Sequence, residues 1–248
     1  MNCISIVIPI YNEKENILIV LEKIIKSLKK IKFEILIVDD HSNDGTFESY
    51  LKVFKNEKRI KYIIRKAKKR DLSKSCQVGF DKSKYNIILV MDGDLQHDPI
   101  YIKKLHKTLI KTKSDLVIGV RDFKKEKLKI LDHNLLRLFF SRLLIVIINI
   151  FLGYKTTDPM SGYFIFKKDL YLKSKKFLFL KGYKILADLL YNSKDKIIIK
   201  DYVIDFNKRL SGSSKMSYKV LFALTEFIFI TYFKKIYLKQ CIIKKNKN

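Results

Sequence analysis

Short apolar runs alternate with amphipathic segments through the first half of the chain, and this alternation constrains the fold more than any other feature. Strands are expected at Ile4–Ile10, Phe33–Val38, Ile60–Ile64, Ile87–Met91 and Asp115–Gly119. Between them, apolar residues recur at helical spacing in residues 15–30, 47–54, 72–82 and 99–111. Continuous apolar strands separated by helices predict an α/β fold, with a mostly parallel twisted sheet flanked by helices on both faces.

The second half of the chain has a different character. A helix is expected over residues 133–152, apolar except for a stripe of Asn134, Arg137 and Ser141. Such a helix is either a core helix with a solvated edge or an amphipathic helix at an interface. Further along, a strand is expected at 163–167, a helix at 181–192, a strand at 196–206 and a helix rich in Phe, Ile and Tyr at 217–240. We expect one large domain over residues 1–216 and an appended helix with a basic tail over 217–248, which docks on a membrane surface or on a second protein.

Two carboxylates follow the apolar run Ile87–Met91. Side chains alternate along an extended backbone, so Asp92, Asp94 and Gln96 are expected to project the same way. Oxygen ligands at a strand's carboxyl end suit a hard cation, Mg²⁺ or Mn²⁺, that also holds phosphates. A solvated acidic turn is the alternative interpretation of this pattern.

The other strand ends also carry polar side chains. In open parallel sheets, ligands bind beyond the carboxyl ends of the strands, where this chain places Tyr11 to Glu13, Asp39, Asp40 and Arg65. The first strand is followed by Pro-Ile-Tyr-Asn-Glu rather than by a glycine-rich phosphate turn, which argues against a dinucleotide oxidoreductase. The basic, hydroxyl-rich stretch Asn207–Met216 is either a phosphate-binding loop or a surface linker.

A net charge of +27 implies an anionic partner: nucleic acid, anionic lipid or a phosphorylated substrate. No nucleic-acid-binding motif accompanies the charge, so we expect no nucleic-acid partner. The cysteines number three, Cys3, Cys76 and Cys241, without metal or disulfide spacing, as suits a reducing compartment. We predict neither a signal peptide nor a spanning helix, and a peripheral location on the cytoplasmic face of a membrane.

Several motifs follow one another between Ile4 and about Lys215: Val7–Glu13, Ile37–Thr46, Val90–Pro99, Ile118–Arg121, Arg137 with Ser141, Asp158 with Ser161 and Gly162, and Arg209 with Gly212 and Lys215. In this order they resemble the motifs of glycosyltransferase family 2 with the GT-A (nucleotide-diphospho-sugar transferase) fold, and within it those of the dolichol- or polyprenol-phosphate mannose synthases.

The resemblance implies a set of site residues. The residues that bind the nucleotide-sugar would be Pro9, Tyr11, Glu13, Val38, Asp40, Asp92, Gly93, Asp94, Gln96, Arg121, Arg209 and Lys215. Those closest to the chemistry would be Asp94, Arg137, Ser141 and Arg209, with the metal, Mg²⁺ or Mn²⁺, on Asp92, Asp94 and Gln96. Asp71 departs from the family, which usually has glycine there, and Tyr163-Phe164 stands where it often has aromatic-Arg.

The resemblance also implies an activity: inverting transfer of a hexose, mannose from GDP-mannose by preference, to a polyprenyl monophosphate at the membrane surface. The helix at 133–152 would be interfacial, and a membrane-anchoring partner subunit is left open. The alternatives are a UDP-sugar-dependent family-2 enzyme acting on an envelope glycan or glycolipid, a non-catalytic basic binding protein, and a scaffold on an inactive transferase fold.

Overall fold

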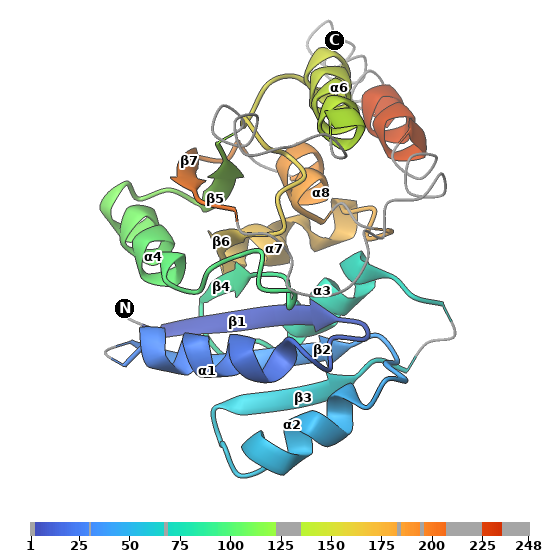
Figure 1. Ribbon diagram of the computed structural model, residues 1–248. Coiled ribbons are helices and arrows are strands. Elements are labelled where there is room, and N and C mark those ends of the chain that lie inside the picture. Colours follow the sequence, from blue (N-terminus) through green and yellow to red (C-terminus); the bar gives the residue numbers. More distant parts are fainter. Residues whose placement is uncertain are drawn as a thin grey trace, which may run out of the picture.

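A seven-stranded mixed sheet forms the centre of the protein in the computed structural model, with strand order β3-β2-β1-β4-β6-β5-β7 (Figure 1). The structure describes residues 3–29, 31–66, 69–122, 135–182, 185–193, 196–206 and 225–234, with side chains from residue 143 onward in the helix that begins at 135. The strands are β1 (Cys3–Ile10), β2 (Lys32–Asp39), β3 (Ile60–Ile64), β4 (Ile87–Val90), β5 (Leu116–Arg121), β6 (Phe164–Lys167) and β7 (Ile199–Ile204).

Helices connect the strands and cover both faces of the sheet. They are α1 (Ile17–Ser27), α2 (Thr46–Phe54), α3 (Leu72–Lys82), α4 (Tyr101–Lys111), α6 (Leu135–Leu152), α7 (Lys168–Ser174), a 3₁₀ turn (Lys175–Phe177) and α8 (Ile185–Asn192). Residues 225–234 are also helical. The expected helix at 72–82 is confirmed residue for residue, whereas α7 and the 3₁₀ turn have no counterpart among the sequence predictions.

Alternation along β1 divides the core into two layers. Ile6 and Ile8 pack with α1 and α4 on one side of the sheet, and Val7 packs with residues of α3, α6 and α8 on the other. Every residue from Ile4 to Ile10 is buried. This arrangement explains the continuous apolar run, because a central strand covered on both faces has no solvent-facing side.

The sheet is mostly parallel, as predicted. β1 pairs in parallel with both β2 and β4, whereas β6 runs antiparallel between β4 and β5. The chain leaves β1 toward β2 and β3 and then returns to the other side of β1 as β4. A topological switch point therefore lies at the carboxyl ends of β1 and β4, where ligands bind in sheets of this type.

Candidate active site

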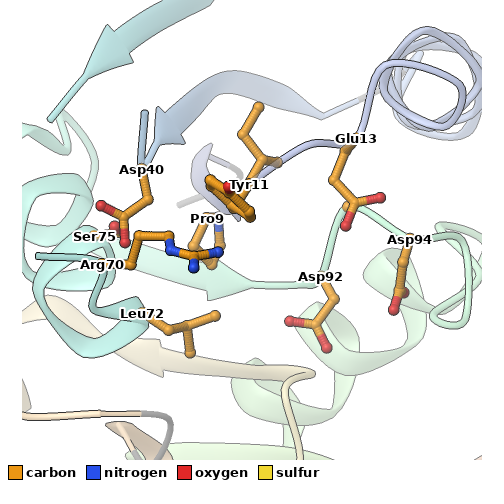
Figure 2. Close-up of a pocket in the computed structure, with 11 residues that line it drawn as sticks. Pro9, Tyr11, Glu13, Asp40, Arg70, Leu72, Ser75, Asp92 and Asp94 are labelled. Carbon is orange, nitrogen blue, oxygen red and sulfur yellow. The ribbon is translucent and has the colours of Figure 1, made fainter. Parts of the chain in front are cut away.

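A pocket opens at this switch point. Its lining comes from the ends of β1, β2 and β4 and from the start of α3: Pro9, Ile10, Tyr11, Glu13, Asp40, Arg70, Leu72, Ser75, Asp92, Gly93 and Asp94. Figure 2 shows Asp40, Arg70 and Ser75 at one side of the pocket and Glu13, Asp92 and Asp94 at the other, with Tyr11 between them. Most of the predicted site residues that the structure describes are thus brought together, as the shared sheet edge requires.

Asp40 lies on one wall and is held by a buried ion pair. The Nε of Arg65 donates to Oδ1 of Asp40 over 2.9 Å, and both residues are at most 9% exposed. The backbone N–H of Asp71 donates to the other oxygen over 2.6 Å. Arg65 also donates to the carbonyl of Lys69, so it fixes the loop that leads into α3. These partners fix the position of the buried Asp40 carboxylate.

Asp39 is structural. One of its oxygens accepts from the backbone N–H and the hydroxyl of Ser42, over 2.8 and 2.7 Å. Its other oxygen accepts from the hydroxyl of Tyr62. Burial and this bond to an anion raise the pKa of Tyr62 far above its ordinary value, so the phenol stays a donor. The sequence grouped Asp39 with Asp40, but only Asp40 lines the pocket.

The rim of the pocket is formed by two interlocked loops, those that follow β1 and β2. Asn12 and Asn43 exchange hydrogen bonds of 3.0 Å, and Ser42 accepts from the backbone N–H of Asn12 over 2.8 Å. Asn12 has φ +55°, a conformation that asparagine tolerates better than most residues. Next to Asn12, the ring centroid of Tyr11 lies 4.2 Å from the guanidinium carbon of Arg70. Arg70 was not among the predicted site residues.

The loop after β4 corrects one expectation. The strand ends at Val90, and Leu95 has φ +64°, so the backbone does not stay extended to Gln96. Instead the backbone N–H of Gln96 donates to Oδ1 of Asp94 over 3.1 Å, which makes a turn. We predicted that Asp92, Asp94 and Gln96 project the same way because side chains alternate along an extended strand. That reason was wrong, because the chain turns after Val90 and the strand does not continue. Both carboxylates still reach the same side of the pocket in Figure 2.

Gly162 gives the Asp92 carboxylate its room. A Cβ on Gly162 would lie 2.4 Å from Oδ2 of Asp92, so a larger residue there would push the carboxylate away. Ser161 anchors this turn by donating to the carbonyl of Gly119 over 2.6 Å. Asp158, fully buried, pairs with Arg121 over 2.7 Å. The motif from Asp158 to Gly162 thus shapes the wall beside Asp92.

His97 packs against the loop that follows β4, and the sequence analysis did not predict this role. Its ring packs 5.0 Å from Tyr163 and 5.4 Å from Phe206, and it is 3% exposed. Burial lowers the pKa of His97 to about 4, so the imidazole is neutral at pH 7. Its Nδ1 can then accept from the backbone N–H of Asp92, 3.4 Å away. No sequence periodicity pairs residue 97 with residue 206, which explains why sequence reasoning missed this contact.

The remaining predicted residues are placed as follows. Val38 is buried in the core, and Arg121 pairs with Asp158 and is not among the residues that line the pocket. Arg137 and Ser141 belong to α6, but their side chains lie outside the described residues, as do all of Arg209 and Lys215. Among the described residues no group of three or more His, Cys, Asp and Glu side chains is arranged to hold a metal. Two carboxylates do fit Mg²⁺ or Mn²⁺, since such ions take the remaining ligands from phosphates and water.

Comparison with known proteins identifies the family. The sequence profile of Glycosyl transferase family 2 matches residues 5–173. A dolichol-phosphate mannosyltransferase of Pyrococcus furiosus is 32% identical over 91% of this chain, which spans only 62% of that relative. A dolichol-phosphate mannosyltransferase of Saccharomyces cerevisiae is 28% identical over 88% of the chain and 82% of its own length.

Solved structures agree on the fold. Glucosyl-3-phosphoglycerate synthase of Mycobacterium tuberculosis, in complex with Mn²⁺, UDP and phosphoglyceric acid, superposes with a TM-score of 0.70 at 16% identity, over 93% of this chain and 77% of that one. A second complex of that enzyme, with Mn²⁺, UDP-glucose and glycerol 3-phosphate, gives a TM-score of 0.67 at 17% identity, over 93% and 78%. The predicted fold and enzyme class are thereby confirmed, and this chain belongs to glycosyltransferase family 2.

Proposed function

We propose that this chain transfers a hexose, mannose by preference, from a nucleotide-sugar to a polyprenyl monophosphate at a membrane surface, with inversion at the anomeric carbon. The observation that carries the proposal is the layout of the pocket. Asp40 lies on one side and Tyr11 in the middle, where a base and ribose would fit, and Asp92 and Asp94 lie on the other side, where a diphosphate would fit. The two dolichol-phosphate mannosyltransferases among the relatives support the choice of sugar and acceptor.

Acidic side chains beside a diphosphate require a cation. Asp92 and Asp94, with Gln96 next to them, would hold Mg²⁺ or Mn²⁺, and the ion would neutralise negative charge that develops on the leaving diphosphate. The side chain of Asp94 faces the pocket and is nearly buried, whereas that of Asp92 is 36% exposed. Arg209 and Lys215 remain predicted cations for the same phosphates.

The acceptor needs placement more than activation. A phosphate monoester is already ionised at neutral pH, so no strong general base is required, only alignment of its oxygen with the anomeric carbon. Arg137 and Ser141 on α6 are the residues proposed to hold it, because a guanidinium gives a phosphate paired donors. A single displacement converts an α-linked donor into a β-linked lipid phosphosugar.

An apolar surface on the C-terminal side of the molecule supports the lipid acceptor. In Figure 1, α6 and the helix 225–234 lie next to each other, away from β3 and α2, and Phe151 contacts Tyr232 with ring centroids 5.7 Å apart. Large apolar side chains are exposed on both helices: Leu143, Val146, Ile150, Phe151, Phe229, Ile230, Tyr232 and Phe233. No helix in the described part of the chain is long and apolar enough to cross a bilayer. We propose that this surface lies on the membrane, with basic side chains near anionic headgroups, as a peripheral attachment.

A second donor deserves the same test. The structural neighbours are complexes with UDP and UDP-glucose, so a UDP-sugar is the alternative to GDP-mannose. The purified chain is incubated with radiolabelled GDP-mannose, UDP-glucose or UDP-galactose, polyprenyl phosphate in vesicles, and Mg²⁺, Mn²⁺ or EDTA. We expect label in the lipid phase only with acceptor and metal, and a β linkage by NMR. Absence of lipid-linked product with every donor would refute the proposed function.

A further inference from the structure

Asp71 occupies a position at which the similar mannose synthases usually have glycine. Its hydrogen bonds reach residues outside the loop that contains it. It is the N-cap of α3, and its Oδ1 accepts from the backbone N–H of Lys74 over 3.1 Å. Its Oδ2 accepts from the backbone N–H of Gly182 over 2.9 Å, from a residue 111 positions later in the chain. One carboxylate therefore both caps a helix and holds a distant segment.

Gly182 is held from both sides. Its carbonyl accepts from the backbone N–H and from the hydroxyl of Ser73, each over 2.8 Å, while its own N–H is bound to Asp71. Gly182 has φ +79°, which favours glycine, although no atom lies within 4 Å of the place a Cβ would take. The first turn of α3 is thus joined to the segment Phe179–Gly182 by three hydrogen bonds.

The same segment is braced on its other side by the C-terminal part of the molecule. Asp188 of α8, 1% exposed, accepts from the backbone N–H groups of Phe179 and Leu180 over 3.0 and 2.7 Å. Lys181 pairs with Glu226 of the helix 225–234 at 2.9 and 3.0 Å. In Figure 1, α8 lies between α3 and the pair formed by α6 and that helix.

The pocket is at the opposite end of these contacts. The backbone N–H of Asp71 donates to Asp40 over 2.6 Å, and Asp71 stands between Arg70 and Leu72, which both line the pocket. Ser75, another lining residue, donates to the carbonyl of Asp71 over 3.2 Å. A displacement of Asp71 therefore moves one wall of the pocket.

We propose that Asp71 is a positioning residue for the donor nucleotide, and that Phe179–Gly182 is a bridge through which the helix 225–234 sets the shape of the donor pocket. This inference rests on the proposed function, which supplies the nucleotide that occupies the pocket and the membrane surface that covers the helix. Because coupling between two sites is reciprocal, a nucleotide in the pocket would in turn strengthen attachment of that helix to its surface.

Two substitutions at Asp71 separate capping from bridging. Serine is about as good an N-cap as aspartate, but its single oxygen cannot serve both Lys74 and Gly182. Asp71→Ser keeps the cap and loses the hydrogen bond to Gly182, so we expect the midpoint of thermal unfolding to fall less than in Asp71→Ala. The Kd for a nucleoside diphosphate should rise about tenfold, on the order of the free energy of one hydrogen bond to a charged acceptor. The KM for the sugar nucleotide should rise with kcat little changed. Asp71→Ala loses both contacts, so it should lower the unfolding midpoint further.

The bridge can also be cut far from the pocket, on the protein surface. Lys181→Glu and Glu226→Lys each place like charges together, and each is expected to raise the Kd about two- to threefold, as an exposed pair allows. The double exchange restores an ion pair of reversed polarity and should restore the Kd. The pair Asp169 and Lys173 on α7, 2.7 Å apart and exposed, is the matched control, and its reversal should leave the Kd unchanged.

Isothermal titration of the full chain with GDP and with UDP, in Mn²⁺, gives the deciding values. If the wild type binds a nucleotide and both Asp71→Ser and the Lys181 and Glu226 variants bind it equally well, the bridge is refuted and the proposed function stands. If the wild type binds neither nucleotide, the proposed function fails and the bridge fails with it. Should Asp71→Ser not fold, the charge exchange at the surface decides alone, with loss and restoration as the supporting result.

Discussion

The two sides of this molecule treat their side chains in opposite ways. At the carboxyl ends of β1, β2 and β4, charged groups are drawn inward and paired, as Asp40 is with Arg65 at 5% and 9% exposure. On α6 and the helix 225–234, large apolar groups point outward, with Ile150 71% and Phe229 65% exposed. The first arrangement builds a polar cavity, whereas the second presents a surface that water solvates poorly.

Under the proposed function this difference separates two substrates: the strand ends, the donor side, would bind a water-soluble nucleotide-sugar, and the two helices, the acceptor side, would face a lipid. A nucleotide binds to polar groups that are held in place, and on the donor side a buried ion pair and two interlocked loops hold them. A lipid needs apolar area rather than fixed polar partners, and exposed side chains such as Ile150 and Phe229 would supply such area. Substitutions of the polar groups at the strand ends should therefore change nucleotide binding, and substitutions of the exposed apolar side chains should change membrane attachment, whereas the Lys181–Glu226 pair couples the two sides.

The largest expected effect is at the tip of β4. Asp94→Asn keeps the shape of the side chain and removes its charge, so we expect sugar transfer to fall roughly 10³-fold, as when one charge-stabilising group is lost. Thermal unfolding in the absence of nucleotide should change little. Asp98→Asn is the matched control, since Asp98 lies in the same loop and does not line the pocket, and its side chain accepts from the backbone N–H of Ile100 over 2.9 Å. Full activity in Asp94→Asn would refute the metal assignment.

The next effect concerns the anchor of the pocket wall. Arg65→Met leaves the Asp40 carboxylate buried without its cation, which should lower the free energy of unfolding by about 3 kcal/mol. The matched control is Arg59→Met, because Arg59 pairs with Glu57 on the surface and its side chain is 45% exposed. That change should cost no more than about 1 kcal/mol. Urea unfolding measures both, and equal losses would show that burial of the Asp40 pair is unimportant.

Much of the donor side followed from the sequence. The strands could be predicted because a short continuous apolar run is typical of a strand buried on both faces. Asp40, Asp92 and Asp94 could be grouped because the carboxyl ends of parallel strands lie at the same edge of the sheet. The order of strands and the antiparallel β6 were not readable, since Phe164–Lys167 has the same apolar pattern whichever way it pairs. The resemblance named the family, and the site residues that it implied remain predictions wherever the described structure ends.

Long-range packing is what the sequence concealed. In the turn after β4 the residue with positive φ is Leu95, at +64°, and not the nearby Gly93, so the sequence does not mark where the chain turns. His97 depends on Tyr163 and Phe206, and Asp71 depends on Gly182, so neither role has a local signal. In both cases the information lies in which distant segments meet, and helical or strand periodicity does not contain it.

A smaller effect tests the acceptor side. Ile150→Ser combined with Phe229→Ser should reduce the vesicle-bound fraction about tenfold or more in flotation with anionic vesicles, because each buried apolar side chain contributes about 1.5–3 kcal/mol. The Kd for a nucleoside diphosphate should not change in the absence of vesicles, because these two side chains are not part of the Lys181–Glu226 contact. Val53→Ser on α2, 55% exposed and far from both helices in Figure 1, is the control and should float like the wild type. If the double variant also floats like the wild type, these helices do not carry the attachment.

The smallest effect separates two kinds of carboxylate within the donor side. Glu34 lies near the amino end of β2, far from the pocket end, and is 5% exposed. Burial raises its pKa, but hydrogen bonds from Lys84, Ser5 and Lys61 outweigh burial and bring the pKa below its ordinary value of 4.5. A carboxylate with a lowered folded-state pKa stabilises the protein above its unfolded-state pKa, and this stabilisation is lost as the pH falls through the folded-state value.

Glu34→Gln should therefore lower the free energy of unfolding by about 1 kcal/mol at pH 7, and the difference from the wild type should shrink as the pH falls below about 4. Nucleotide affinity at pH 7 should be the same in both, in contrast to Asp94→Asn. A difference in stability that is equal at pH 7 and pH 3 would mean that the glutamine amide fits the site poorly for reasons other than charge. The contrast then distinguishes Asp94, at the carboxyl end of β4 where ligands bind in such sheets, from Glu34, a structural carboxylate near the amino end of β2.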